Sequence, residues 1–182
     1  MNPQQLKEFI QRVARSVLYE DIGAGTIPLY HYSTSSSDTL LLNPEKFGSN
    51  PHSKREMNTS DVPRVFFYTD PKQREKELFG ASHNLFVANV PFDQIYNLKQ
   101  DPLKLFQTYG RHGIHEILLF LSGWTRKTGK WLKIPDSEKP NSVQNIKGAM
   151  YDLGRFKVVI WFEPIMVKKV NPEEKTELER DS

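Results

Sequence analysis

The chain has 182 residues, of which 37% are hydrophobic, and it contains no cysteine. This length suits one domain and not two full cores, and the missing cysteine excludes disulfide scaffolds, cysteine-ligated zinc sites and thiol catalysis. The formal charge is +3; the segment 171–182 carries five acidic and two basic residues, so residues 1–170 carry +6. Such a charge suits an anionic ligand, a dinucleotide or a nucleic acid, although ordinary surface lysines would give the same sum.

The apolar stretches of the chain are short. Ile114–Phe120 and Val158–Phe162 are far below the length of a membrane-spanning helix. The first residues do not combine a basic region with an apolar run, so we expect no secretory signal. These features predict a cytoplasmic protein with no membrane association.

The first segment has the pattern of an amphipathic helix. Asn2 is a suitable cap, Pro3 suits the first helical position, and the apolar residues that follow fall on one face. We expect this helix to span residues 1–26 and to pack on a domain of residues 27–170. The segment 171–182 is then an acidic tail.

The rest of the chain mixes strand and helix patterns. The expected strands are 27–33, 40–42, 64–68, 84–90 and 156–167, with Pro164 marking a bulge or an edge in the last. The expected helices are 70–80, 101–106 and 141–150, while 114–121 fits a buried helix or a strand equally well. Residues 131–132 suggest the edge of a hairpin, and 43–63 a long loop of the kind that is often functional. The order lacks regular βαβ alternation, which favours the α+β class.

The sequence lacks the motifs of several well-known types of active site. There is no glycine-rich phosphate loop at a strand–helix junction and no Gly-x-Ser-x-Gly elbow. His112 and His115 are spaced as two ligands on a helix face would be, but Glu116 is the only carboxylate beside them, so we expect no metal site. His31 lies between Tyr30 and Tyr32, and on a strand its side chain would face away from both. It is either functional or a satisfied polar residue near a sheet edge.

Five segments in order carry a family resemblance. Together they span about residues 27–168, and they are Leu29–Ser33, Leu42–Gly48, Arg64–Tyr68, Val90–Pro102 and Gly148–Val167. This set resembles the ADP-ribosyltransferase-like domain of phage and mobile-element polyvalent proteins, within the His-Tyr-Glu type of that superfamily. The resemblance implies an α+β fold with a split, mostly antiparallel β-sheet core of ADP-ribosyltransferase type, preceded here by the N-terminal helix. A phage-encoded protein would act in the host cytoplasm or in the virion.

The resemblance also implies an NAD site and an activity. NAD would be bound by His31, Tyr32, Ser33, Arg64 and Tyr68, with His31 and Ser33 at the adenosine-side ribose and Tyr68 stacked on the nicotinamide ring. Tyr68 and Glu163 are the implied catalytic residues, because a carboxylate on the ribose 2′-hydroxyl would stabilise an oxocarbenium-like transition state. The reaction would modify a macromolecular target, a protein more readily than a nucleic acid.

Three alternatives stay open from the sequence. The carboxylate could be Glu116 if residues 114–121 form a strand. The chain could instead keep the fold without transfer activity and act as a virion-associated or host-binding interaction protein. Asn43, which stands where the family pattern has an aspartate, departs from that pattern and is compatible with this alternative. A third reading is a nucleic-acid-binding module in which Trp124 and Trp131 of the basic stretch 111–133 stack on bases, unless these tryptophans anchor a hairpin onto the core.

Overall fold

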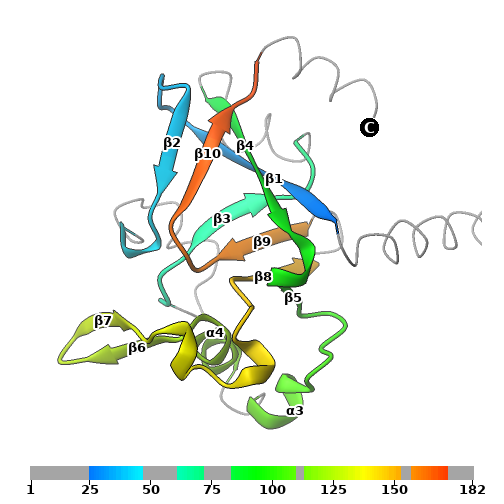
Figure 1. Ribbon diagram of the computed structural model, residues 1–182, viewed down its shortest axis with the longest axis vertical. Coiled ribbons are helices and arrows are strands. Elements are labelled where there is room, and N and C mark those ends of the chain that lie inside the picture. The colour runs from blue at the N-terminus through cyan, green and yellow to red at the C-terminus, as the bar shows by residue number, and fades with distance from the viewer. Residues whose placement is uncertain (1–24, 47–60, 72–82, 110–112, 153–156, 172–182) are drawn as a thin grey trace, which may run out of the picture.

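A computed structural model describes residues 25–46, 61–71, 83–109, 113–152 and 157–171 (Figure 1). Almost all of the expected N-terminal helix, the helix after Pro71, the long loop and the acidic tail lies outside these residues. Within them, no helix is long and apolar enough to cross a membrane.

The described elements are mostly strands. The strands are β1 (Thr26–Ser33), β2 (Thr39–Leu42), β3 (Val65–Tyr68), β4 (Asn84–Pro91), β5 (Ile95–Asn97), β6 (Trp124–Lys127), β7 (Lys130–Lys133), β8 (Gly148–Asp152), β9 (Lys157–Trp161) and β10 (Ile165–Lys169). The helices are α3 (Leu105–Tyr109) and α4 (Ile114–Ser122), with short 3-10 helices at Pro44–Lys46, Phe92–Gln94, Asp136–Glu138 and Asn141–Val143. The expected α+β class with a large, mostly antiparallel sheet is confirmed.

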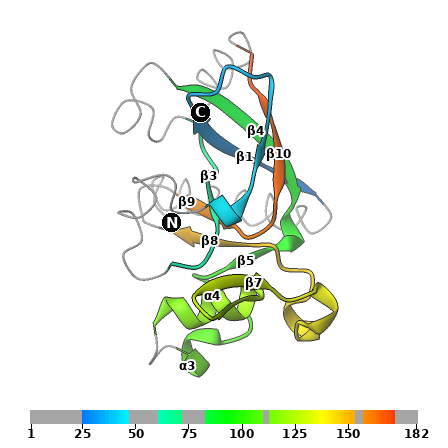
Figure 2. The same ribbon diagram turned by 90° about the vertical axis from the view of Figure 1, so that its left-hand side faces the viewer.

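The large sheet consists of two halves. Its strand order is β2-β10-β4-β1-β3-β9-β8-β5, and every neighbouring pair is antiparallel except β5 with β8. β1 pairs with β4 along its whole length, whereas a single register pair, Tyr30 with Tyr68, joins β1 to β3. The four strands β2, β10, β4 and β1 therefore form one half, the four strands β3, β9, β8 and β5 form the other, and the junction is narrow (Figures 1 and 2).

The core has three parts. One buried cluster draws side chains from both halves of the sheet, among them Leu29, Phe67, Phe86, Val159 and Val167, so it lies on the inner face that the halves share. A second packs α4 against the outer face of the β3-β9-β8-β5 half, and Figure 2 shows α4 below that half. The third lies on the outer face at the junction of the halves and contains three tyrosines, which are described below.

Residues 114–121, which fitted a helix or a strand, form helix α4. Ile117, Leu118 and Leu121 are buried on the sheet. Gly123 ends the helix in the left-handed conformation (φ 68°), and its N–H bonds to the Leu119 carbonyl, as is usual at a helix C-terminus. The helix expected over 101–106, which precedes α4 in the chain, begins later than expected. Asp101 and Lys104 have positive φ, and regular helix starts only at Leu105.

The expected helix over 141–150 is wrong. Only a 3-10 turn forms at Asn141–Val143, and the stretch then runs into strand β8. The Cα of Gly148 lies so close to Trp161 of β9 that a Cβ would come within 2.7 Å of the indole ring. Pairing between β8 and β9 therefore overrides the helix-like spacing of the apolar residues.

The expected strand 156–167 is two strands. β9 ends at Trp161 and β10 begins at Ile165, so Pro164 lies in the connection between them. β9 enters one half of the sheet, between β3 and β8, and β10 enters the other, between β2 and β4. The break at Phe162–Pro164 thus carries the chain from one half to the other.

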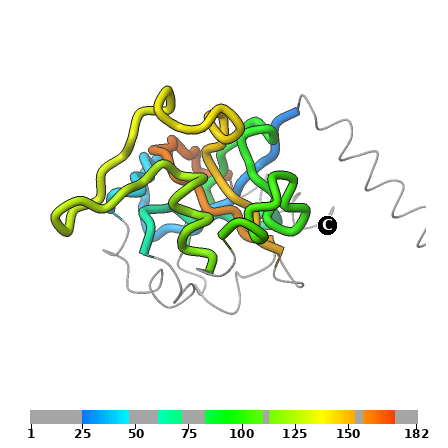
Figure 3. The backbone as a smooth tube through the Cα atoms, turned by 90° about the horizontal axis from the view of Figure 1, so that it is seen from below, coloured from blue at the N-terminus to red at the C-terminus, as the bar shows by residue number. Residues whose placement is uncertain are grey.

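The expected hairpin edge at 131–132 is part of a separate two-stranded sheet. β6 and β7 pair antiparallel with Lys127 opposite Lys130, and Thr128 and Gly129 form the turn. The hairpin projects sideways from the body of the molecule, as both Figure 1 and the view from below in Figure 3 show.

Candidate functional site

Three tyrosines meet on the outer face of the sheet at the junction of its halves; we call this group the tyrosine face. It comprises Tyr30 and Tyr32 of β1 and Tyr68 of β3, which are 5%, 6% and 4% exposed. Alternation along β1 places Tyr30 and Tyr32 on one side, and the pairing of Tyr30 with Tyr68 brings the third ring to the same side. The ring centroids of Tyr32 and Tyr68 are 6.2 Å apart, and the hydroxyl of Tyr32 donates to the Pro71 carbonyl. Two of the predicted NAD residues, Tyr32 and Tyr68, are therefore neighbours.

Arg64 continues this face along the chain entering β3. Side chains alternate between the two faces of a strand, so Arg64 and Val65 point to opposite sides and Arg64 lies on the side of Phe66. The guanidinium carbon of Arg64 lies 5.2 Å from the centre of the Phe66 ring. One terminal nitrogen donates to the Val62 carbonyl at 2.9 Å. Burial lowers the pKa of Arg64 to about 10, against the opposing effect of Tyr151 and Asp61. The group remains charged at neutral pH.

Tyr151, which no sequence pattern singles out, lies near Arg64. It is on β8 and packs with Phe66 and Ile146 against the cluster under α4. Its hydroxyl oxygen is buried and has no hydrogen-bond partner among the residues that the structure describes. Burial raises the pKa of the phenol, and the charge of Arg64 acts against that rise. The outer face therefore holds a buried cation and, close to it, a neutral hydroxyl with unused hydrogen-bonding capacity.

His31 lies on the opposite side of the sheet from the tyrosine face. Its ring is tilted against that of Phe67, with centroids 5.7 Å apart, on the inner face. Nδ1 lies 2.9 Å from the carbonyl oxygen of Phe66, and because a carbonyl only accepts, Nδ1 carries the proton. Burial lowers the pKa of His31, while this bond acts in the opposite direction. His31 is thus a neutral, satisfied histidine that bridges β1 and β3.

Ser33 also belongs to the inner side of β1 by alternation, two residues after His31. Its hydroxyl accepts a hydrogen bond from the Ser35 amide at 3.2 Å, which is the usual serine turn at a strand end. The structure therefore separates the predicted NAD residues into two groups. Tyr32, Arg64 and Tyr68 share the outer face, and His31 and Ser33 face the other way.

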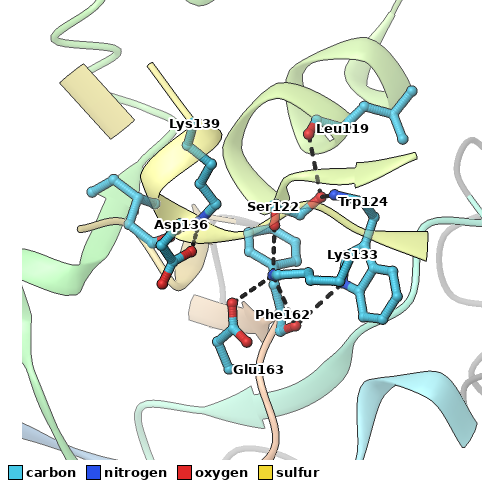
Figure 4. Close-up of polar contacts among 9 residues, drawn as sticks. Leu119, Ser122, Trp124, Lys133, Asp136, Lys139, Phe162 and Glu163 are labelled. Atoms are coloured by element: carbon cyan, nitrogen blue, oxygen red, sulfur yellow. Dashed lines mark hydrogen bonds and ion pairs between the residues drawn. The ribbon is translucent and has the colours of Figure 1, made fainter. Parts of the chain in front are cut away.

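Glu163 lies in the connection between β9 and β10. Its Oε1 is 2.5 Å from Nζ of Lys133 at the base of the hairpin, and the two side chains are 23% and 22% exposed (Figure 4). The same ammonium donates to the carbonyl of Ser122 at 2.6 Å and lies 5.3 Å from the centre of the Trp124 ring. Burial lowers the pKa of Lys133, and the contact with Glu163 acts in the opposite direction. The carboxylate is thus engaged in holding the hairpin to the end of β9.

Glu163 and Tyr68 occupy opposite ends of the same strand pair. Tyr68 is opposite Val158 and Val65 is opposite Trp161, so the chain leaves β9 toward Glu163 at the Val65 end. Glu163 comes five positions after Val158, the residue opposite Tyr68, and the β9 part of this path, from Val158 to Trp161, alone spans roughly 10 Å. The alternative carboxylate, Glu116, is in the first turn of helix α4 and not on a strand. The two implied catalytic residues are not brought together.

Of the two roles that the sequence allowed for Trp124, stacking on bases or anchoring a hairpin, the structure shows the second. Trp124 is 5% exposed, and its indole N–H donates to the Phe162 carbonyl at 3.2 Å, so it fixes the hairpin to the core. Trp131 is half-buried, and the guanidinium of Arg126 lies over its ring at 5.6 Å. Stacking of Trp124 on nucleic-acid bases is therefore not supported.

Comparison of the chain with protein-family models, with curated proteins and with solved structures finds no match. Among the described residues, no three histidine, aspartate or glutamate side chains gather as a metal site would require.

Proposed function

We propose that this chain is an ADP-ribosyltransferase-like protein that binds NAD at the outer face of its sheet. The observation that supports the proposal is the narrow junction at Tyr30 and Tyr68 within a large, mostly antiparallel sheet. Two of the implied NAD residues lie beside it, and Arg64 follows on the same face.

The side chains there fit the chemical parts of NAD. Tyrosine rings suit the flat adenine or nicotinamide, and a permanently charged guanidinium suits the pyrophosphate. The Tyr151 hydroxyl supplies a further donor or acceptor for a ribose or phosphate oxygen. Because Arg64 and Tyr68 are only 2% and 4% exposed, the packing over them has to open for NAD to reach them.

The implied reaction breaks the bond between the nicotinamide nitrogen and C1′ of the ribose. Nicotinamide leaves with the bonding electron pair, and a nucleophilic atom of the target bonds to C1′ and gives up its proton. A carboxylate near the 2′-hydroxyl would stabilise the positive charge that develops on the sugar. Glu163 with Tyr68 remains the prediction for this step.

A second candidate function follows from the ion pair of Glu163 with Lys133 and from the distance between Glu163 and Tyr68. Both features favour a protein that keeps the fold and NAD binding but transfers nothing, and acts through its interactions. In this reading Glu163 is a structural residue.

Calorimetric titration with NAD and a thermal unfolding series with and without NAD test the binding proposal. A ligand that binds only the folded chain adds about 2.7 kcal/mol at one hundred times its Kd. Tyr151→Phe removes only the buried hydroxyl and should weaken NAD binding. Ser33→Ala, on the inner face and away from the His31–Phe66 bond, is the matched control and should leave it intact. Loss of NAD binding in Ser33→Ala alone would instead support placement of NAD at the inner face.

Transfer is tested separately with NAD labelled in its adenylate phosphate and a cell lysate. Label on a macromolecule that disappears in Glu163→Gln, while NAD binding persists, would establish an enzyme. NAD binding without any labelled product would establish the non-catalytic function. Neither binding nor label would reject both.

A further inference from the structure

We propose that the β6–β7 hairpin is a basic ribbon that binds the phosphate backbone of double-stranded nucleic acid. This inference goes beyond the proposed NAD site and does not depend on it. It starts from composition: between Ile117 and Pro135 the chain has four basic residues and no acidic one. All four, Arg126, Lys127, Lys130 and Lys133, belong to the two strands of the hairpin.

The register of the hairpin separates its side chains into two faces. One face carries Trp124 opposite Lys133 and Arg126 opposite Trp131. In each of these pairs the cation lies over the indole ring, at 5.3 Å for Lys133 and 5.6 Å for Arg126. This face stiffens the ribbon and, through Trp124 and Lys133, attaches it to the body.

The other face ends in two lysines directly opposite each other. Lys127 and Lys130 are a cross-strand pair beside the turn, and both are exposed. Like charges at this position destabilise a hairpin, and among the described residues neither lysine forms an ion pair. An anion placed between them would remove the repulsion. In nucleic acid, the anions that a basic ribbon contacts are the phosphate groups of the backbone.

The shape of the ribbon agrees with a duplex as the partner. Figures 1 and 3 show that the hairpin stands away from the rest of the described chain, so a long partner can pass it without meeting the body. A two-stranded ribbon is also one of the two elements that the major groove of a duplex admits. Arg126 lies on the opposite face, where Trp131 and an ion pair with Asp61 at 2.9 Å hold it, so the phosphate contacts are assigned to the two lysines.

The test is the salt dependence of duplex binding, measured by fluorescence anisotropy with a labelled 20-base-pair DNA of arbitrary sequence. Each phosphate contact contributes about 0.9 to the slope of log K against log salt concentration. The double variant Lys127→Ala with Lys130→Ala should bind more weakly, with a slope smaller in magnitude by about 1, because the two lysines share one phosphate. The matched control, Lys104→Ala with Lys168→Ala, removes two exposed lysines elsewhere and should leave the slope unchanged.

Three results would overturn the proposal. The first is no duplex binding at 50 mM salt, and the second is an equal loss in the two double variants, which would indicate only the net charge. The third is displacement of the duplex by poly-glutamate at equal charge concentration, which would identify an acidic polypeptide as the partner instead. An unfolding temperature of the Lys127→Ala, Lys130→Ala variant at or above that of the wild type, as relief of the repulsion predicts, establishes that weaker binding does not come from loss of folding.

Discussion

His31 of β1 donates from Nδ1 to the backbone carbonyl of Phe66 in β3, over 2.9 Å, one residue after the single register pair that joins the two strands. A side chain thus supplies a connection where the strand ladder has ended. The tyrosine face lies on one side of this point, and His31 packs on the other.

The burial of His31 predicts an acid-sensitive fold. Burial lowers the pKa of His31 in the folded chain below its ordinary value of 6.5, so below that pH the unfolded chain binds the proton more readily. The contribution of His31 to stability is complete above pH 6.5 and is lost as the pH falls toward the folded-state pKa. Urea unfolding between pH 7.5 and 5 should show a steeper loss for the wild type than for His31→Asn. Equal pH slopes for the two would contradict the prediction.

The Lys133–Glu163 contact predicts a coupled pair. Glu163→Gln leaves a largely buried ammonium without its carboxylate, at a cost of about 1–3 kcal/mol in the free energy of unfolding. Adding Lys133→Met should recover most of that loss, and a double-mutant cycle measures the coupling. Glu138→Gln, at an exposed position, serves as the control and should change stability by less than about 0.5 kcal/mol. Additive effects of the two substitutions would show that the pair is not coupled.

The Tyr151 hydroxyl predicts a gain of stability on its removal. A buried polar group without a hydrogen bond is unfavourable, so Tyr151→Phe should raise the free energy of unfolding by about 1 kcal/mol in the absence of ligand. Chemical denaturation measures this directly. A loss of stability of similar size would show that the hydroxyl is hydrogen-bonded in solution.

The hairpin turn predicts opposite effects at two adjacent residues. Thr128 and Gly129 have φ values of 50° and 80°, the combination of a type I′ turn, which favours Asn-Gly. Thr128→Asn should therefore stabilise the chain by about 0.5 kcal/mol. Gly129→Ala should cost about 1 kcal/mol through its backbone alone, because an added Cβ has no atom within 4 Å. Thermal unfolding of both variants checks the signs, and a stabilising Gly129→Ala would contradict the assigned turn.

The sequence predicted those elements whose pattern is local. The strands expected at 84–90 and 64–68 form as β4 and β3, and the hairpin edge expected at 131–132 lies in β7. The segment 141–150 did not, because apolar spacing of three residues can also arise from a turn that leads into a strand. Its conformation depends on contact with Trp161, which is distant in the sequence.

The candidate site also combines features that the local sequence predicts with features that depend on distant contacts. Alternation along β1 predicted that His31 would face away from Tyr30 and Tyr32, and the structure has this arrangement. Which of these faces Tyr68 shares depends on the register between β1 and β3, and no local pattern specifies that register. Tyr151 and Lys133 could not be selected for a similar reason, because each gains its role from groups brought close only by the folded sheet.

The strand order also has a consequence for how the protein is made. β9 and β10 come late in the chain, yet each lies between two strands that were synthesised earlier. Until residues 157–169 have left the ribosome, β3 and β8 have no shared neighbour, and neither do β2 and β4. Neither half of the sheet is complete before then, so the nascent chain exposes strand edges until that point. The sheet is therefore expected to form only once these residues are available, and truncation before Ile165 should leave a chain prone to aggregation.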